Sequence, residues 1–297
     1  MNYTNKLGLH EVLAVAIMNK QYSGDGEKRD YSVTELLKPP KQAVLMQRHK
    51  DEITVDVADQ LWAFMGEIAH LILERAIESS DDIKKKYLSE NRYKIEYDGF
   101  VISGGVDLYD KESKSITDYK MTSAWTVYFG GRESWEQQLN IYAYILRKHG
   151  LEVNKLSICT IYRDWSKKMI NIPNYPKQQS EVLDFDVWND FQVECFLTQK
   201  LSLLEKYKTL ADDDMPECSP EERWGNNGGY WAVQNSKTKR VYKKCDTEQD
   251  AIDYLHEKQY SGCEIVEVKA IDRMCVGYCP VRSFCHYGRT LDVMEEE

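Results

Sequence analysis

The sequence predicts an α/β fold: a large domain over residues 1–210, followed by a small Cys-containing α+β module over residues 211–297. Three observations carry this prediction. Helical and strand patterns alternate through the first two thirds of the chain. The composition becomes acidic and rich in Pro, Gly and Asn at residues 211–229. Beyond that segment the pattern reads hairpin, helix, strand and a cluster of cysteines.

The first third of the chain predicts helices. Residues 1–50 read as a helical lead-in, in which residues 32–45 begin with Ser and Thr and break at two prolines. Residues 55–78 give the strongest helical signal. The apolar residues that recur there at helical spacing are Leu61, Met65, Ile68 and Ile72.

The middle of the chain mixes strands and helices. Period-2 apolar runs predict strands at residues 92–97, 100–109, 115–121 and 155–165. A helix is predicted at residues 134–150, where Ser134 and Gln137 would form a capping box and Gly150 would end it. The remaining predicted elements are a helix at 184–210, a hairpin at 230–244, a helix at 247–259 and a strand at 264–271.

Charge and hydropathy exclude some classes of protein. The 297-residue chain has a net charge of −10, whereas a general nucleic-acid coat protein would be basic. No apolar run approaches the roughly 20 residues of a membrane helix. The short run at residues 12–18 follows His10 and Glu11 and lacks a small-residue cleavage site. We therefore expect a soluble cytoplasmic protein with no membrane partner, in the host cytoplasm if the gene belongs to a phage.

The segment GGVDLYDKESKSITDYK places acids on an apolar hairpin. If Tyr109 pairs with Ile116 across the polar turn, Asp107 falls opposite Asp118. Lys120 then shares the face of Asp118, because strand side chains alternate. Opposed carboxylates repel unless a cation lies between them, and Mg²⁺ suits such a pair. Lys120 could orient or deprotonate a water molecule, or offset charge on a phosphate.

An acid two residues before a lysine is common in a charged chain. It also occurs as Asp82 with Lys84, Glu112 with Lys114, and Glu267 with Lys269. Most such triplets are solvated faces. The pair Asp118 and Lys120 is distinguished by the Gly-Val-Asp motif upstream at hairpin spacing and by apolar strand residues on both sides.

Two helices that flank the hairpin in sequence add polar side chains at helical spacing. Gly66, His70 and Glu74 share one face of the first, and Gln138 and Tyr142 share one face of the second. Singly, these residues are explained as a histidine at the core edge paired with a glutamate, and as half-buried polar residues. Their combination with the hairpin favours a site.

These motifs together resemble the RecB-type branch of the PD-(D/E)XK nuclease superfamily. They are GEIAHLILE (66–74), GGVD (104–107), DYK (118–120) and QLNIY (138–142), in that order. The resemblance covers about residues 30–165. It implies a restriction-endonuclease-like core, in which helices flank a mixed central sheet, and metal-dependent hydrolysis of DNA phosphodiesters.

The resemblance also implies the roles of individual residues. The implied ligands of Mg²⁺ or Mn²⁺ are His70, Asp107, Asp118 and the backbone carbonyl of Tyr119, with Glu74 as a further candidate. The implied catalytic residues are Asp107, Asp118, Lys120, Gln138 and Tyr142. Lys120 would be the catalytic lysine, and Gln138 and Tyr142 would position DNA or that lysine.

Three of the eight cysteines, Cys275, Cys279 and Cys285, lie close together near the C-terminus. In a cytosolic protein such a cluster points to a metal rather than to disulfides. Many RecB-like nucleases hold an iron–sulfur cluster with a similar trio and one cysteine before the core. Here no cysteine precedes position 159. Cys218 or His286 could supply a fourth ligand, so we expect structural zinc, with an iron–sulfur cluster or free thiols as the alternatives.

Several basic and aromatic residues are candidate DNA contacts. The basic candidates are Lys84 to Lys86, Arg132, Arg147, Lys148, Arg163, Lys167, Lys168 and the stretch 237–244. The aromatic candidates are Trp125, Tyr128, Phe129 and Trp135. Each also has an ordinary explanation as a solvated or core residue.

The sequence thus predicts a metal-dependent DNA exonuclease that acts in end processing or recombination of a phage or mobile element. Its partners would be single- or double-stranded DNA ends and a recombination protein. The alternatives are a catalytically silent DNA-binding or scaffold protein on the same fold, and an endonuclease of the same superfamily.

Overall fold

The computed structural model describes residues 2–19, 29–130, 132–225, 229–269 and 271–291. Its elements, in chain order, are β1 (Asn2–Thr4), α1 (Glu11–Met18), β2 (Tyr31–Ser32), α2 (Val33–Leu36), α3 (Pro40–Arg48), β3 (Thr54–Asp56), η1 (Val57–Gln60), α4 (Leu61–Glu78), α5 (Asp81–Lys86), β4 (Tyr87–Tyr97), β5 (Phe100–Asp110), β6 (Ser115–Thr122), α6 (Ala124–Tyr128), α7 (Glu133–Lys148), β7 (Lys155–Tyr162), η2 (Lys167–Met169), β8 (Ser180–Phe185), α8 (Asp190–Lys208), β9 (Tyr230–Asn235), β10 (Val241–Cys245), α9 (Glu248–Lys258), β11 (Cys263–Val268), η3 (Met274–Tyr278), η4 (Arg282–Phe284) and α10 (His286–Thr290).

The chain divides into two compact units. One comprises residues 1–43 and 54–206, and the other comprises residues 44–53 and 207–297. The predicted boundary after residue 210 stays a prediction about domains. Ala270, in the last predicted strand, and residues 226–228, in the predicted boundary segment, lie outside the described residues.

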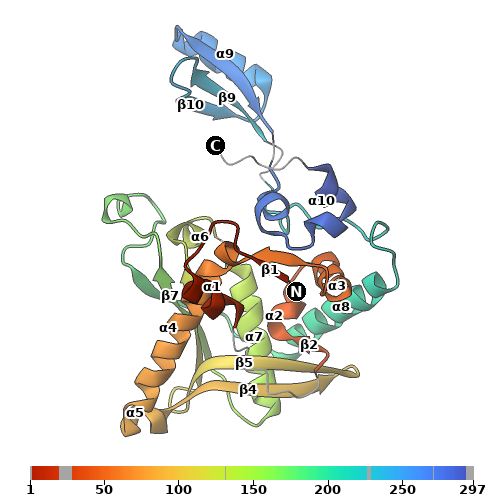
Figure 1. The fold of residues 1–297 in the computed structure, drawn as a ribbon. Helices are drawn as coiled ribbons and strands as arrows, with labels where there is room; N and C mark the ends of the chain where they lie inside the picture. Colours follow the sequence, from red (N-terminus) through yellow and green to blue (C-terminus); the bar gives the residue numbers. More distant parts are fainter. Residues whose placement is uncertain (1, 20–28, 131, 226–228, 270, 292–297) are drawn as a thin grey trace. The chain divides into compact units, whose positions relative to one another are not determined.

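A six-stranded mixed sheet forms the centre of the first unit. Its order is β2-β5-β6-β7-β8, with β4 also paired to β5. The β4/β5, β5/β6 and β7/β8 pairs are antiparallel, whereas β2/β5 and β6/β7 are parallel. Helices pack on this sheet, and Figure 1 shows α7 against it, beside the long hairpin of β4 and β5. The expectation of an α/β fold with a mixed central sheet flanked by helices is confirmed.

The ladder on one edge of β5 is interrupted. Because β4 pairs with β5 from Phe100 to Asp110, β2 and β6 must both use the other edge. There β2 pairs with Ile102 and Ser103, and β6 pairs with Leu108 to Asp110. Residues Gly104–Asp107 lie between the two pairings, so β5 and β6 separate where the predicted acids begin.

The core of the first unit lies between α7 and the sheet. Leu139, Ile141, Ile145 and Leu146 of α7 are fully buried. A Cβ atom on Gly104 would lie 2.9 Å from the ring carbons of Tyr142. The glycine therefore allows the close approach of the helix to β5.

Alanine at this glycine is expected to disturb both packing and the residues beside it. We expect Gly104→Ala to lower the free energy of unfolding by about 1–3 kcal/mol, since the added methyl group overpacks the Tyr142 ring. Gly105→Ala is the matched control, because its Cβ would meet only the Arg92 guanidinium at 3.7 Å. Urea unfolding of the two variants measures the difference, and equal stabilities would contradict the packing argument.

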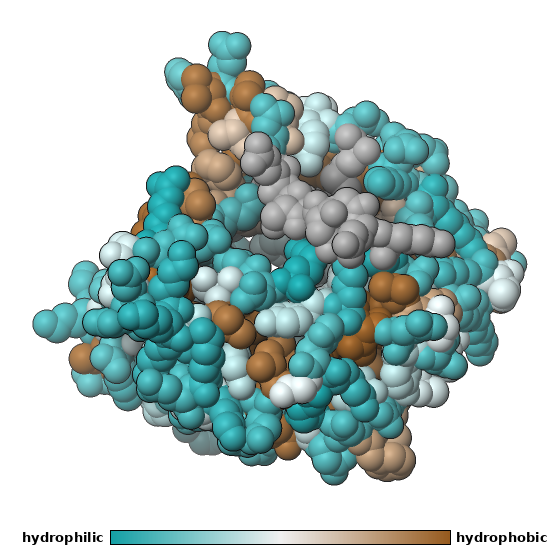
Figure 2. Space-filling view, turned by 90° about the horizontal axis from the view of Figure 1, so that it is seen from below, coloured by the Kyte–Doolittle hydropathy of each residue, from teal (hydrophilic) through white to brown (hydrophobic). Residues whose placement is uncertain are grey.

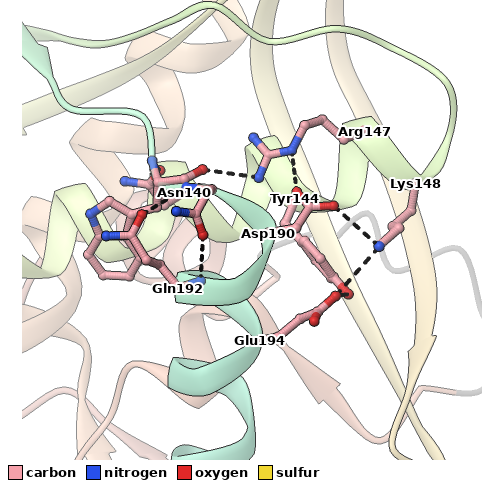
Figure 3. Close-up of polar contacts among 9 residues, drawn as sticks. Asn140, Tyr144, Arg147, Lys148, Asp190, Gln192 and Glu194 are labelled. Atoms are coloured by element: carbon pink, nitrogen blue, oxygen red, sulfur yellow. Dashed lines mark hydrogen bonds and ion pairs between the residues drawn. The ribbon is translucent and has the colours of Figure 1, made fainter.

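Polar contacts join α7 to the start of α8 (Figure 3). Arg147 Nε donates to Asp190 Oδ1 at 2.7 Å, and Lys148 Nζ lies 3.4 Å from Asp190 Oδ2. Tyr144 OH donates to Glu194 Oε1 at 2.8 Å. Arg147 and Lys148 were candidate phosphate contacts, but both cations already pair with carboxylates of α8.

The first helical signal differs in detail from the structure. Residues 55–60 form the end of β3 and the turn η1, so α4 begins only at Leu61. Leu61 packs with Phe64 against a cluster of Ala14, Ile17 and Val57. The predicted apolar stripe is not the buried face, because Met65 and Ile72 are exposed.

Two further predictions about helices were wrong. The capping box at Ser134 does not form, because α7 begins at Glu133 and Gln137 Nε2 donates to the Glu133 side chain instead. The helix predicted at residues 184–210 begins at Asp190, since the alternating residues before it form β8.

In the second unit, β9 pairs with β10 and with β11 in a three-stranded antiparallel sheet. Val233, Cys245 and Ala251 form its core, in which Ala251 belongs to α9. Residues 44–53 join this unit through His49, whose ring stacks on Phe284 at a centroid distance of 3.9 Å.

The described helices include none that combines the length and apolar character needed to cross a bilayer. The face of the molecule in Figure 2 is mainly hydrophilic, and its apolar residues form separate small patches.

Candidate active site

Asp118 and Lys120 lie where β5 and β6 separate. The predicted register is confirmed, since Tyr109 pairs with Ile116, but the ladder stops at Leu108 and Thr117. Asp118 is 1% exposed. Lys120 Nζ lies 2.7 Å from its Oδ2 atom, although this buried oxygen accepts no hydrogen bond of ordinary geometry. The carboxylate is thus charge-paired but not saturated with donors.

Gln138 of α7 reaches the same carboxylate, and Tyr142 of α7 contacts Gln138. Gln138 Nε2 donates to Tyr142 OH at 2.7 Å and lies 3.4 Å from Asp118 Oδ1. Both side chains are buried. They therefore hold Asp118 in place from within the core instead of facing the surface.

His70 of α4 reaches toward the other acid. Its Nδ1 atom lies 3.6 Å from Asp107 Oδ2 and 3.3 Å from Glu90 Oε1, and its Nε2 atom lies 3.2 Å from the Tyr119 carbonyl oxygen. The Tyr119 backbone N–H donates to Asp107 Oδ2 at 2.8 Å, which fixes the orientation of that carboxylate. The structure thus brings together His70, Asp107 and the Tyr119 carbonyl oxygen.

Glu90 is a neighbour that the sequence analysis missed. Its position in β4 is opposite Asp107, because Ser89 pairs with Leu108 and Asn91 pairs with Val106. Glu90 has a φ of 52°, in the left-handed region that residues other than glycine rarely adopt. Such backbone conformations persist where the surrounding structure enforces them, and they are frequent at functional sites.

The crowded carboxylates and His70 shift one another's protonation. Burial, and then the charge of Asp118, raise the pKa of Asp107 to about 7. The hydrogen bond to Glu90 raises the pKa of His70 to about 9, and the charge of Asp107 acts in the same direction. Burial and the neighbouring carboxylate therefore disfavour the charged form of Asp107 in the metal-free site.

This donor set fits a hard divalent cation. One ligand atom each from His70, Glu90 and Asp107 lies within 4.8 Å of the other two. Carboxylate and carbonyl oxygens are the ligands of Mg²⁺ and Mn²⁺. The unsaturated Asp118 oxygen and the raised pKa of Asp107 both indicate that a cation would be favoured here. Glu74, one turn beyond His70, is half-buried and is not a member of this group.

The four predicted cysteines of the second unit lie within electrostatic reach of one another. Burial raises the pKa of Cys218 to about 12, and charge on Cys275, Cys279 and Cys285 adds to the rise. Among the described residues, these four sulfurs do not form a second group as tight as the one around His70. Phe284 precedes Cys285, and its stacking on His49 holds this segment in place.

The comparisons with known proteins find only partial likenesses. No family model matches the chain, and no curated protein matches it. The crystal structure of SSO0001 aligns with a TM-score of 0.46 and 15% identity, over 65% of this chain and 85% of that one. The structure of a phage related exonuclease from Haemophilus somnus 129PT aligns with a TM-score of 0.30 and 15% identity, over 46% of this chain and 67% of that one. Both TM-scores are low, so neither structural similarity assigns a function to this chain.

Proposed function

We propose that this chain is a metal-dependent DNA nuclease on a restriction-endonuclease-like core, and that it acts as an exonuclease on DNA ends. One observation carries the proposal: Asp107, Asp118 and Lys120 meet at the gap in the sheet, beside His70 and Glu90. Two buried acids, a lysine and an unsaturated carboxylate oxygen are more than packing requires.

The residues of the site would have two roles, metal binding and stabilisation of charge on the phosphate. Asp107, Asp118, His70, Glu90 and the carbonyl that follows Asp118 would hold Mg²⁺ or Mn²⁺. When bound, the ion would neutralise the carboxylates and stabilise charge that develops on phosphate oxygens. Lys120 would place its ammonium beside the phosphate, where it offsets the same charge.

Residues behind the site would keep these groups oriented. Gln138 would fix the Asp118 carboxylate through its hydrogen bond, and Tyr142 would support Gln138. The Tyr119 N–H fixes Asp107 in the same way. Such support allows the catalytic groups to keep their geometry while substrate enters.

The test is digestion of end-labelled linear and of circular DNA, each in single- and double-stranded form, with Mg²⁺, Mn²⁺ or chelator. We expect linear DNA to be cut from its ends only when the metal is present. Cleavage of circular DNA would indicate an endonuclease instead. Binding without cleavage under every condition would support the catalytically silent alternative and contradict the proposal.

We further propose that Cys218, Cys275, Cys279 and Cys285 bind zinc as a structural site. Four thiolates are a ligand set that zinc and iron–sulfur clusters share. Desolvation raises the pKa of Cys275 to about 11 and that of Cys218 to about 12, so metal-free thiols would stay protonated at neutral pH. Metal binding must therefore release protons, and it should weaken as the pH falls.

Replacing single ligands separates the candidates for the fourth position. We expect Cys218→Ser to lose most of the bound zinc in metal analysis, because only three of the four cysteine ligands remain, whereas His286→Ala should keep it. Cys195→Ser, at an exposed cysteine of α8, is the control. Retained zinc in Cys218→Ser with loss in His286→Ala would assign the fourth ligand to the histidine. A visible absorption band would point to an iron–sulfur cluster.

A further inference from the structure

We propose that the carboxyl ends of β6 and β7 form a subsite for an unpaired nucleic-acid strand. Trp62 and Phe129 would stack on bases there, and Arg132 and Arg163 would bind phosphates. The inference rests on the proposed function, because it names the form of DNA that reaches Lys120.

The subsite begins close to the candidate active site. Thr122 follows Lys120 by two residues on β6, a distance of about 7 Å along a strand. Thr122 pairs with Tyr162, the last residue of β7, and its carbonyl accepts a hydrogen bond from the Arg163 N–H at 3.0 Å. The sheet itself therefore sets Arg163 beside the site.

Arg163 is exposed and lies over an exposed aromatic ring. Its guanidinium carbon is 4.7 Å from the centroid of Trp62, which is 58% exposed. Trp62 lies in the first turn of α4, the helix that also carries His70. An exposed indole beside a guanidinium offers a stacking surface and a phosphate contact at one place.

A second aromatic group is fixed to the same end of β7. Asp164 accepts hydrogen bonds from the Ala124 N–H at 2.7 Å and from Ser123 Oγ at 2.5 Å, and so it anchors α6. Phe129, at the end of α6, is 77% exposed. Its ring is supported by Tyr128 at a centroid distance of 4.9 Å. The ring thus rests against Tyr128 while most of its surface faces solvent.

Arg132 adds a cation whose hydrogen bonding is incomplete. Its Nε atom is buried and has no hydrogen-bond partner among the described residues. Burial raises the pKa of Tyr162 and the charge of Arg132 opposes that rise, so this arginine also lies near the end of β7. Arg132 is half-buried, so its guanidinium can still offer N–H donors to a phosphate oxygen.

The chemistry favours a single strand over a duplex or a protein. In a duplex the base faces are already stacked, whereas an unpaired strand presents them to Trp62 and Phe129. Two arginines beside these rings, in a chain with a net charge of −10, match a polyanion. A protein partner that docks on an apolar face has no need of the two guanidinium groups, whereas a nucleic-acid strand has phosphates for them to bind.

Fluorescence anisotropy in chelator tests the subsite without cleavage. The probes are a labelled single strand, the same strand with abasic sites, and a blunt duplex. We expect Trp62→Ala and Phe129→Ala each to weaken single-strand binding by about tenfold, and to have little effect on the duplex or the abasic strand. Arg132→Gln and Arg163→Gln should each lower the salt slope by about 0.7. The controls on α8 are Phe191→Ala, at a 72% exposed ring, and Lys200→Gln, whose ammonium lies 5.6 Å over Phe196.

Single-strand affinities of Trp62→Ala and Phe129→Ala within twofold of the controls would overturn the inference. So would an equal loss on all three probes, or a changed oligomeric state in sedimentation with unchanged DNA binding. The result is separate from the proposed function. Lost binding in these variants of a protein that never cuts DNA would retain the subsite and refute the nuclease, and normal binding in an active nuclease would do the reverse.

Discussion

Replacing Lys120 with alanine is expected to reduce DNA cleavage by at least about 10²–10³-fold, while the protein still folds. The lysine is the one predicted catalytic group that brings positive charge, and removing one such group from a preorganised site costs about this much. Its ammonium also offsets the Asp118 carboxylate at 2.7 Å, so a modest fall in melting temperature should accompany the loss. End-labelled DNA, digested with saturating Mg²⁺, measures the rate.

The chain supplies its own control for this substitution. Lys269 also follows an acid by two residues, and it lies exposed directly after β11. We expect Lys269→Ala to cut at close to the wild-type rate. Cleavage by Lys120→Ala at the rate of Lys269→Ala would remove Lys120 from the mechanism.

Replacing Asp107 with asparagine is expected to abolish cleavage and to stabilise the metal-free protein above neutral pH. Burial and Asp118 raise the pKa of Asp107 from 3.8 to about 7 in the folded state. The folded protein therefore binds this proton more tightly than the unfolded chain does. The stability that results is complete below about pH 4 and is lost as the pH rises through about 7.

Asparagine cannot ionise, so the variant escapes that loss. In chelator we expect its melting temperature to exceed that of the wild type by about 2–4 °C at pH 8, which corresponds to about 1 kcal/mol, and by less at pH 5. His70 partly offsets the gain, because Asp107 contributes to its raised pKa of about 9. A difference in melting temperature that does not change with pH would contradict the electrostatic explanation.

The hairpin and its register could be predicted because the signals are local. Tyr109 and Ile116 flank a polar turn, and period-2 alternation then fixes which residues oppose each other. The approach of Asp118 and Lys120 follows from the same alternation.

The gap and Glu90 could not be predicted, because distant parts of the chain create them. Strand β2 comes some seventy residues before its pairing site on β5 and has only two residues. Glu90 lies within the strand sequence YLSENRYKIEY. Its left-handed backbone conformation could not be predicted, because the residue is not the glycine that usually adopts it. The sequence offered one indication of this irregularity: the polar residues Ser89, Glu90 and Asn91 break the apolar alternation just before the predicted strand begins.

The sequence also could not predict which side of α4 is buried. An apolar stripe identifies a helix but not the partner that covers it. Here α1 and η1 pack on Leu61, the first residue of the predicted stripe, and on Phe64 beside it, while Met65 and Ile72 face solvent. Long-range packing decided which of several apolar residues became core.

The interrupted ladder of β5 also bears on how the protein resists aggregation. Unpaired strand edges are templates on which other chains add strands. On the edge of β5 that faces β2 and β6, Gly104–Asp107 have no partner strand among the described residues. This stretch is bounded by β2 at one end and by β6 at the other, so it is too short for an incoming strand to pair with. The edge of β5 that lacks a neighbouring strand therefore lies beside Asp107 and is enclosed within the sheet, where a strand of another chain cannot pair with it.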